Sequence, residues 1–201
     1  MKLNLPRPTI LTADARLARR TLLTLLATVA LAGVGGMPVS AQDWRVYRPE
    51  GSGFRVELPA DPEIFTEQKT SQRYGALTET RAMVEFEDVD IFVGHVEYHE
   101  ATPPSLHDYV KGFREGISKL APLTLVDDRE IIISGVPGRE LALTFKNDFN
   151  NGKTIMRFVI AANRLLEFNV SRNQPDDLKV EDNPIASRFL RSISLLPPLA
   201  R

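Results

Sequence analysis

Residues 140–170 read ELALTFKNDFNNGKTIMRFVIAANRLLEFNV, and this stretch decides the fold of the chain. Apolar side chains recur at every second position in three successive runs, a period that is typical of half-buried β-strands. The polar segment 147–152 and the short reversal 162–164 separate these runs. The pattern predicts three consecutive antiparallel strands, whose core faces carry Leu141, Leu143 and Phe145, then Met156, Phe158 and Ile160, and finally Leu166, Phe168 and Val170.

Further strands are expected on the N-terminal side of this meander. Phe54, Val56 and Leu58 alternate with charged residues and stop before Pro59, which predicts another half-buried strand. The remaining expected strands are 44–47, 64–69, 76–86, 91–99 and 124–133, with turns at 75, 87–90 and 134–138.

Two helices are predicted beside the strands. Residues 106–120 carry apolar side chains at the three-and-four spacing of a helix, and Ser105 is placed to cap the first turn. A second helix at 184–193 has Asn183 as its cap and Pro184 at its first position. A meander with one helix inserted and one appended predicts an α+β domain, an antiparallel sheet covered by helices on both faces.

Four short segments match those of a known fold family. They are GFRVELP at 53–59, GVPGRE at 135–140, NRLLEF at 163–168 and FLRSI at 189–193. With this order of elements, the chain resembles the PsbP/Mog1-like domains over nearly all of its length after residue 41. The resemblance implies an α/β/α sandwich, and it implies non-catalytic binding, since the family includes photosystem accessory subunits, a small-GTPase binding factor and many exported bacterial proteins.

Residues 1–41 have the features of a secretory signal peptide. Basic residues precede an apolar run that begins at Thr21, and small residues at 39–41 offer a cleavage site after Ala41. An uncleaved anchor is the alternative, but it needs about 18 consecutive apolar residues, and threonines and glycines interrupt this run. Arg19 and Arg20 fit either the general secretory route or twin-arginine export. We therefore expect a single domain at 42–201 in the bacterial periplasm, or secreted, with no membrane span after cleavage.

Composition excludes several classes of function. The chain has no cysteine, so thiolate zinc sites, disulfides and cysteine nucleophiles are absent. Residues 1–41 hold five of the 25 basic residues and one of the 26 acidic residues, which leaves 20 basic and 25 acidic residues in the predicted domain. This acidic balance argues against nucleic acid as a partner. No serine elbow or phosphate-binding loop is found, and no cofactor is expected.

One cluster could carry chemistry, namely His95, Glu97 and His99. Alternate residues of a strand share a face, and neighbouring members lie about 6.6 Å apart along the strand, within reach of a shared metal ion. The two histidines of the strand are about 13 Å apart, so a further ligand such as His107 would be required. The alternative interpretation is a solvated face near the end of the strand.

Other charged residues of the strands are interpreted structurally. Arg157 alternates with apolar neighbours and is expected to point into solvent. Arg139 and Glu140 are adjacent, so they face opposite sides of a strand and cannot share a site. The sequence thus predicts an exported, cofactor-free binding or accessory domain that recognises another envelope protein through its sheet edge or loops. The alternative hypothesis is a metal-binding protein or metal-dependent enzyme that uses His95, Glu97 and His99.

Overall fold

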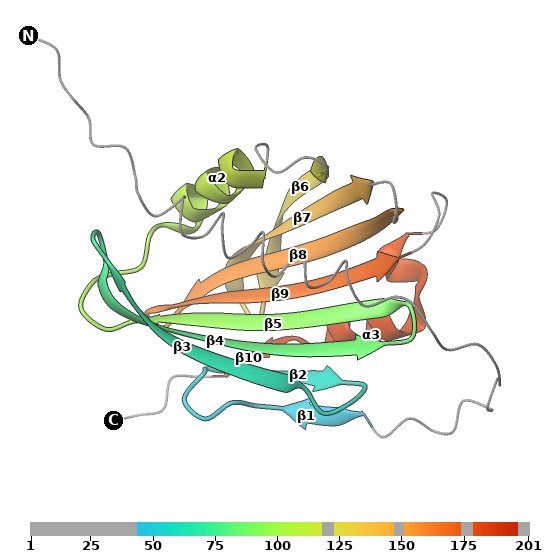
Figure 1. The fold of residues 1–201 in the computed structure, drawn as a ribbon, viewed down its shortest axis with the longest axis horizontal. Coiled ribbons are helices and arrows are strands. Elements are labelled where there is room, and N and C mark those ends of the chain that lie inside the picture. The colour runs from blue at the N-terminus through green and yellow to red at the C-terminus, as the bar shows by residue number, and fades with distance from the viewer. Residues whose placement is uncertain (1–43, 118–122, 147–150, 174–178, 197–201) are drawn as a thin grey trace, which may run out of the picture.

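The computed structural model describes residues 44–117, 123–146, 151–173 and 179–196. The predicted signal segment and residues 147–150 of the predicted loop lie outside these ranges. Within the described residues, the strands form a large seven-stranded sheet and a small three-stranded sheet (Figure 1). None of the helices described is long and apolar enough to span a membrane.

The large sheet is antiparallel throughout, with its strands in the order β3-β4-β5-β9-β8-β7-β6. Its strands are β3 (Glu63–Ser71), β4 (Gly75–Phe86), β5 (Val89–Tyr98), β6 (Leu123–Ile133), β7 (Val136–Lys146), β8 (Asn151–Ala161) and β9 (Arg164–Asn173). The three strands predicted from residues 140–170 are confirmed as β7, β8 and β9. Because β9 then pairs with β5, the meander and the β4-β5 hairpin share one continuous sheet.

The small sheet consists of β1 (Arg45–Tyr47), β2 (Phe54–Leu58) and β10 (Ser194–Leu195), with β2 in the middle. The predicted alternation of β2 is confirmed, since Phe54, Val56 and Leu58 are at most 1% exposed. The two-residue strand β10 was not predicted. It pairs with Arg55 and Phe54, so it depends on a contact between distant parts of the chain.

Both predicted helices are present, as α2 (Leu106–Ile117) and α3 (Pro184–Ser192), and residues 118–120 of the first prediction lie outside the described residues. The Ser105 hydroxyl accepts a hydrogen bond from the backbone N–H of Asp108 at 3.1 Å. The Asn183 side chain accepts bonds from the backbone N–H groups of Ile185 and Ala186 at 2.8 and 3.1 Å. These bonds satisfy donors that a helix start leaves without partners. A short 3₁₀ helix, η1 (Val180–Asp182), precedes α3 and was not predicted.

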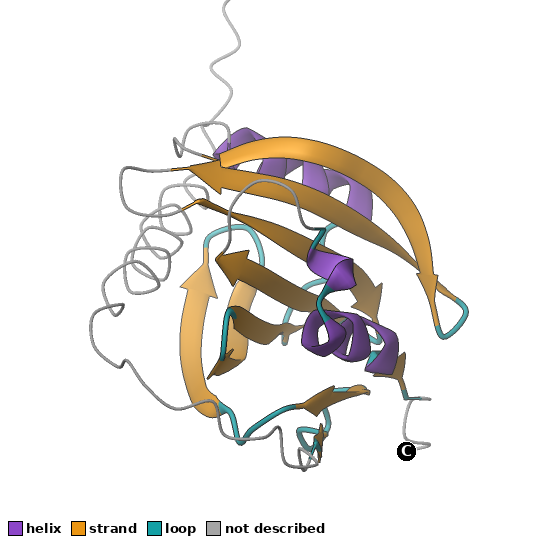
Figure 2. Cartoon of the chain, turned by 90° about the vertical axis from the view of Figure 1, so that its right-hand side faces the viewer, coloured by secondary structure: helices purple, strands orange, loops and turns teal. Residues whose placement is uncertain are grey.

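The two helices cover opposite faces of the large sheet (Figure 2). We call the face that packs against β2 and α3 the inner face, and its core includes Val93, Phe168 and Phe189. The opposite, outer face packs against α2 over β7 and β8, where Phe158 is fully buried. β8 is therefore buried on both faces, since Ile155 belongs to the inner core.

Two turns are shorter than predicted. The β4-β5 hairpin turns at Glu87 and Asp88, and Val89 is already paired with Phe86. The β6-β7 hairpin turns at Ser134 and Gly135, which both have positive φ, and the strand resumes at Val136. Two-residue turns with positive φ match the twist of antiparallel strands. The turn that the Gly and Pro residues of 134–138 predicted is therefore too long, since only Ser134 and Gly135 form it.

Candidate functional site

Strand β3 forms one edge of the large sheet and is exposed on both faces. It pairs with β4 over nine residues, from Glu63 opposite Met83 to Ser71 opposite Gly75, without a break in register. Ile64 and Phe65 are 54% and 49% exposed, one on each face. No other described strand pairs with the free side of β3, so its outward N–H and C=O groups are open to a partner.

Charged residues gather on the outer face beside this edge. The Lys69 ammonium forms an ion pair with Glu79 and lies 3.4 Å from a Glu67 carboxylate oxygen. The Arg81 guanidinium Nε donates to Glu79 at 2.6 Å. On the inner face, the Thr66 and Thr80 hydroxyls lie 3.3 Å apart. The β3 edge is thus held to β4 by side-chain contacts on both faces.

The opposite edge, β6, has a different construction. Its register against β7 shifts between Leu125 and Asp127, which marks a bulge at Val126. Residues 127–130 are all charged, and the Asp128 carboxylate accepts a bond at 2.8 Å from Arg114 of α2. Along the strand, exposed residues are interspersed with partly buried ones, and Ile133 at its end is buried. A bulge and charged side chains are common means by which proteins protect sheet edges.

Arg157 is not solvated, contrary to the prediction. It lies on the inner face, where its Nε donates to Glu140 at 2.7 Å and its Nη1 donates to the Leu190 carbonyl at 2.6 Å. Glu140 is 3% exposed and also binds Arg129 of β6. The prediction was wrong because it assumed a single core face, whereas β8 is buried on both sides. Arg139 points to the outer face, toward Asp128, so the expected separation from Glu140 is confirmed.

His95, Glu97 and His99 lie toward one end of the inner face, and each has a different partner. The His95 ring packs edge-on against Phe54 with 6.0 Å between centroids. Glu97 accepts a bond from Arg164 at 2.6 Å, and His99 Nε2 lies 2.8 Å from the Thr78 hydroxyl. His95 and Glu97 are half-buried and His99 is exposed, so the interpretation as a solvated face holds at the end of the strand and only in part at His95.

Burial lowers the pKa of His95 below its ordinary value of 6.5, and the Arg164 guanidinium lowers it further, against a smaller opposing effect of Glu97. His107 cannot complete a site with His95, since it lies on α2 and therefore on the outer side of the sheet. Among the residues that the structure describes, no group of three or more His, Asp or Glu side chains could hold a metal ion. Metal binding at His95, Glu97 and His99 stays a prediction.

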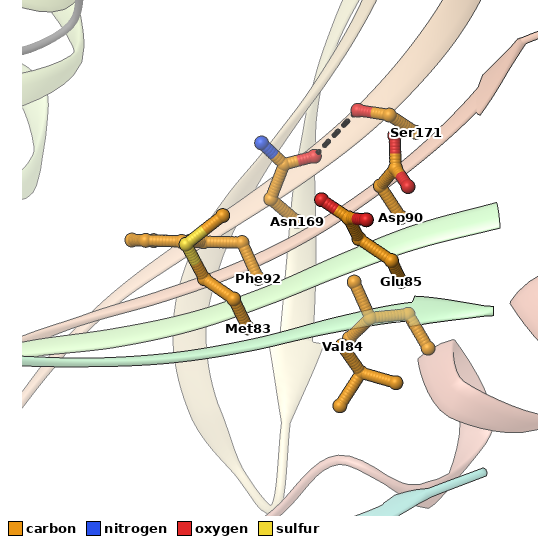
Figure 3. Close-up of a pocket in the computed structure, with 8 residues that line it drawn as sticks. Met83, Val84, Glu85, Asp90, Phe92, Asn169 and Ser171 are labelled. Atoms are coloured by element: carbon orange, nitrogen blue, oxygen red, sulfur yellow. Dashed lines mark hydrogen bonds between the residues drawn. The ribbon is translucent and has the colours of Figure 1, made fainter. Parts of the chain in front are cut away.

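A small hollow lies on the sheet where β4, β5 and β9 meet (Figure 3). Met83 and Phe92 form its apolar side, and the carboxylates of Glu85 and Asp90 lie near Asn169 and Ser171, which share a hydrogen bond. The hollow holds about 30 Å³. That is room for about one water molecule, whereas pockets for small ligands are on the order of 300–1,000 Å³. This hollow is therefore too small to bind a metabolite.

The open edge is the feature that local sequence patterns did not single out. A strand at 64–69 was predicted, but its neighbours in the sheet were not. One signal was present in the composition of 63–71, EIFTEQKTS, which has no clean alternation of apolar and polar residues. A strand that is mostly polar on both faces is typical of a sheet edge.

Several solved structures are similar to this chain. Cyanobacterial PsbP (CyanoP) from Synechocystis sp. PCC 6803 has 13% identity and a TM-score of 0.49, over 82% of this chain and 98% of that chain. A Pseudomonas aeruginosa protein of unknown function has 16% identity and a TM-score of 0.44, over 77% and 98%. LpqN of Mycobacterium tuberculosis, described as involved in cell envelope biogenesis, has 10% identity and a TM-score of 0.44, over 77% and 91%.

The PsbP/Mog1-like domains, which the four sequence segments resemble, are thus represented among the similar structures by cyanobacterial PsbP. No protein-family model and no curated protein matches the chain. At identities of 10–16% and TM-scores below 0.5, these similarities carry no inference about function. Function has to be argued from the residues of this chain.

Proposed function

We propose that this protein is an exported, non-catalytic binding or accessory domain that recognises another protein of the bacterial envelope at the open edge of its large sheet. The partner would contribute an extended segment that adds a strand to β3. In this mode of recognition, backbone hydrogen bonds supply affinity and alternate side chains supply specificity.

The observation that carries the proposal is the exposure of β3. Its nine residues keep one continuous register with β4, so an added strand would find an unbroken row of backbone donors and acceptors. Ile64 offers apolar contact on the inner face and Phe65 on the outer face. An added strand would cover part of both side chains, a gain of roughly 25 cal/mol for each Å² of apolar surface covered.

Export is supported by residues 1–41, which carry a basic segment, an apolar run and a small-residue cleavage site. The absence of cysteine fits a domain that holds together by packing alone. Its two cores, one on each face of the sheet, supply that packing.

The test is partner capture with paired edge variants. The full chain would be expressed in a bacterium, recovered from the periplasm and cross-linked to its neighbours there. We expect a mature protein that begins at Gln42 and a reproducible cross-linked partner. Ile64→Lys places a charge on the open edge and should abolish the cross-link. Ile132→Lys is the matched control, because Ile132 is 77% exposed on the β6 edge, and it should retain the partner.

Two outcomes would refute the proposal. A partner that both variants retain binds elsewhere on the protein. A chain that is recovered from the cytoplasm with its N-terminal segment intact is not exported.

A further inference from the structure

The two edges of the large sheet differ in how they can associate. β6 is interrupted by the bulge at Val126 and carries four consecutive charged residues at 127–130. β3 has no such interruption over Glu63–Ser71. A long, regular and exposed edge is a template for pairing with any other strand, including an identical one.

We propose that β3 pairs with β3 of a second copy of this chain, antiparallel and about a twofold axis at Thr66, whenever no other partner occupies the edge. This inference goes beyond the proposed function, because the strand of another protein would have to displace the second copy. A twofold contact pairs the two open edges with each other, so neither edge stays available for a further copy. The remaining edges of the combined sheet are the two bulged β6 strands, so the assembly stops at a dimer.

The register follows from the faces of β3. Twofold antiparallel pairing keeps each face of the sheet on the same side, so odd-numbered residues face odd-numbered residues. Three registers keep most of the strand paired, with the axis at Thr66, Glu67 or Gln68. With the axis at Thr66, Glu63 of each copy faces Lys69 of the other, and this pair of opposite charges occurs twice.

The other two registers are less favourable. With the axis at Glu67, this carboxylate faces its own copy, and like charges directly opposite each other are destabilising. With the axis at Gln68, Glu63 and Ile64 face residues beyond the end of the strand, so exposed Ile64 stays uncovered.

Apolar contacts favour the same register as the charges. With the axis at Thr66, the two Phe65 side chains are diagonal neighbours about 7–8 Å apart, a separation that aromatic rings can bridge. Each Phe65 also lies diagonal to Lys69 of the second copy, which allows a cation–π contact. Lys69 lies on the outer face, where its ammonium contacts Glu67 and, on β4, Glu79, so Glu63 of the second copy would be a third carboxylate on the same face of the sheet.

The first test measures the oligomeric state of the protein that the cell produces from the full chain. Because the contact of two strands is smaller than the roughly 1,200 Å² of a standard interface, we expect a dimer that dissociates on dilution. Sedimentation would follow this equilibrium. Thr66→Lys places two ammonium groups opposite each other at the axis and should weaken the dimer at least about tenfold. Ile132→Lys, on the bulged edge, should leave the dimer unchanged.

The second test reads the register by cross-linking. Since the chain has no cysteine, a single introduced thiol can form a disulfide only between copies. In Thr66→Cys the two Cβ atoms would lie about 4.5–5.5 Å apart, close to disulfide geometry. We expect Thr66→Cys to cross-link at least about tenfold faster than Glu67→Cys or Gln68→Cys, whose thiols are farther apart in this register.

Three results would overturn the inference. These are a monomer at every concentration, a dimer that Thr66→Lys leaves intact, and faster cross-linking at position 67 or 68. A monomer that still captures an envelope partner through β3 would refute self-pairing and leave the proposed function in place.

Discussion

Strands β3 and β6 form the two edges of the same sheet, yet only β6 is supported from several sides. Next to β6, helix α2 packs on the outer face of β7 and β8, and Arg114 of this helix binds Asp128. Beneath β6, buried Glu140 joins Arg129 and Arg157 on the inner face. Beside β3, no described helix packs on the sheet, and the strand is exposed on both faces.

This difference shows that a sheet edge is protected by its neighbours as well as by its own residues. Both strands carry charged residues and exposed apolar ones, since Ile64 on β3 and Ile132 on β6 are both more than half exposed. What sets β6 apart is the bulge at Val126 and the contacts from α2, β7 and β8. We therefore expect the same kind of substitution to have unequal effects on the two sides of the sheet.

The largest difference is expected for two phenylalanines. Phe158 is fully buried under α2, with 5.0 Å between its ring centroid and that of Phe113. Phe158→Ala should lower the free energy of unfolding by about 3–5 kcal/mol. Phe65→Ala, on the open edge, should change it by less than about 1 kcal/mol. Chemical denaturation of the two variants measures this contrast, and equal losses would contradict the assignment of β3 as an open edge.

The next effect concerns two carboxylates. Glu140→Gln leaves Arg157 with an uncompensated charge on the inner face, and it should cost about 3 kcal/mol of stability. Glu67→Gln is the matched change on β3, where the carboxylate is 57% exposed and its ion pair with Lys69 is worth less than about 1 kcal/mol. Denaturant midpoints of both variants test this order. A neutral Glu140→Gln would mean that the buried network does not stabilise the β6 side.

The smallest effect is a pH dependence that arises in β5, two strands from the open edge. The pKa of His95 is lowered in the folded protein, so the unfolded chain binds a proton more readily. Its contribution to stability is therefore complete above about pH 6.5 and is lost as pH falls below that value. The loss is at most about 1.4 kcal/mol per pH unit.

Unfolding measured between pH 7.5 and 5 should show this slope, reduced in His95→Gln, where no imidazole remains to titrate. If wild type and His95→Gln lose stability in parallel over this range, His95 is not the group responsible.

Local patterns predicted most of the elements correctly. Alternation in 140–170 placed β7, β8 and β9, and the three-and-four spacing placed α2 and α3 with their caps. The same patterns failed where one strand has two buried faces. Arg157 was expected in solvent because Met156 and Phe158 occupy one core face, but Ile155 and Val159 occupy another.

The candidate site was predicted only as a choice between sheet edge and loops. A strand at 64–69 carries no information about which strands lie beside it, because strand order depends on contacts between residues far apart in the sequence. The pairing of β5 with β9, which links Val89 to Arg172, is such a contact. It places the meander on one side of the β4-β5 hairpin and leaves β3 on the other.

The sequence by itself determined the α+β class, the strands of the meander, the helix starts and the absence of thiol chemistry, because each depends on residue types within a few positions of one another. Tertiary structure alone decided that β3 is open, that β6 is protected and that His95 packs against Phe54. These properties depend on which surfaces meet after the chain folds. Period-two alternation shows that a strand has two different faces, but only its neighbours determine what covers each of them.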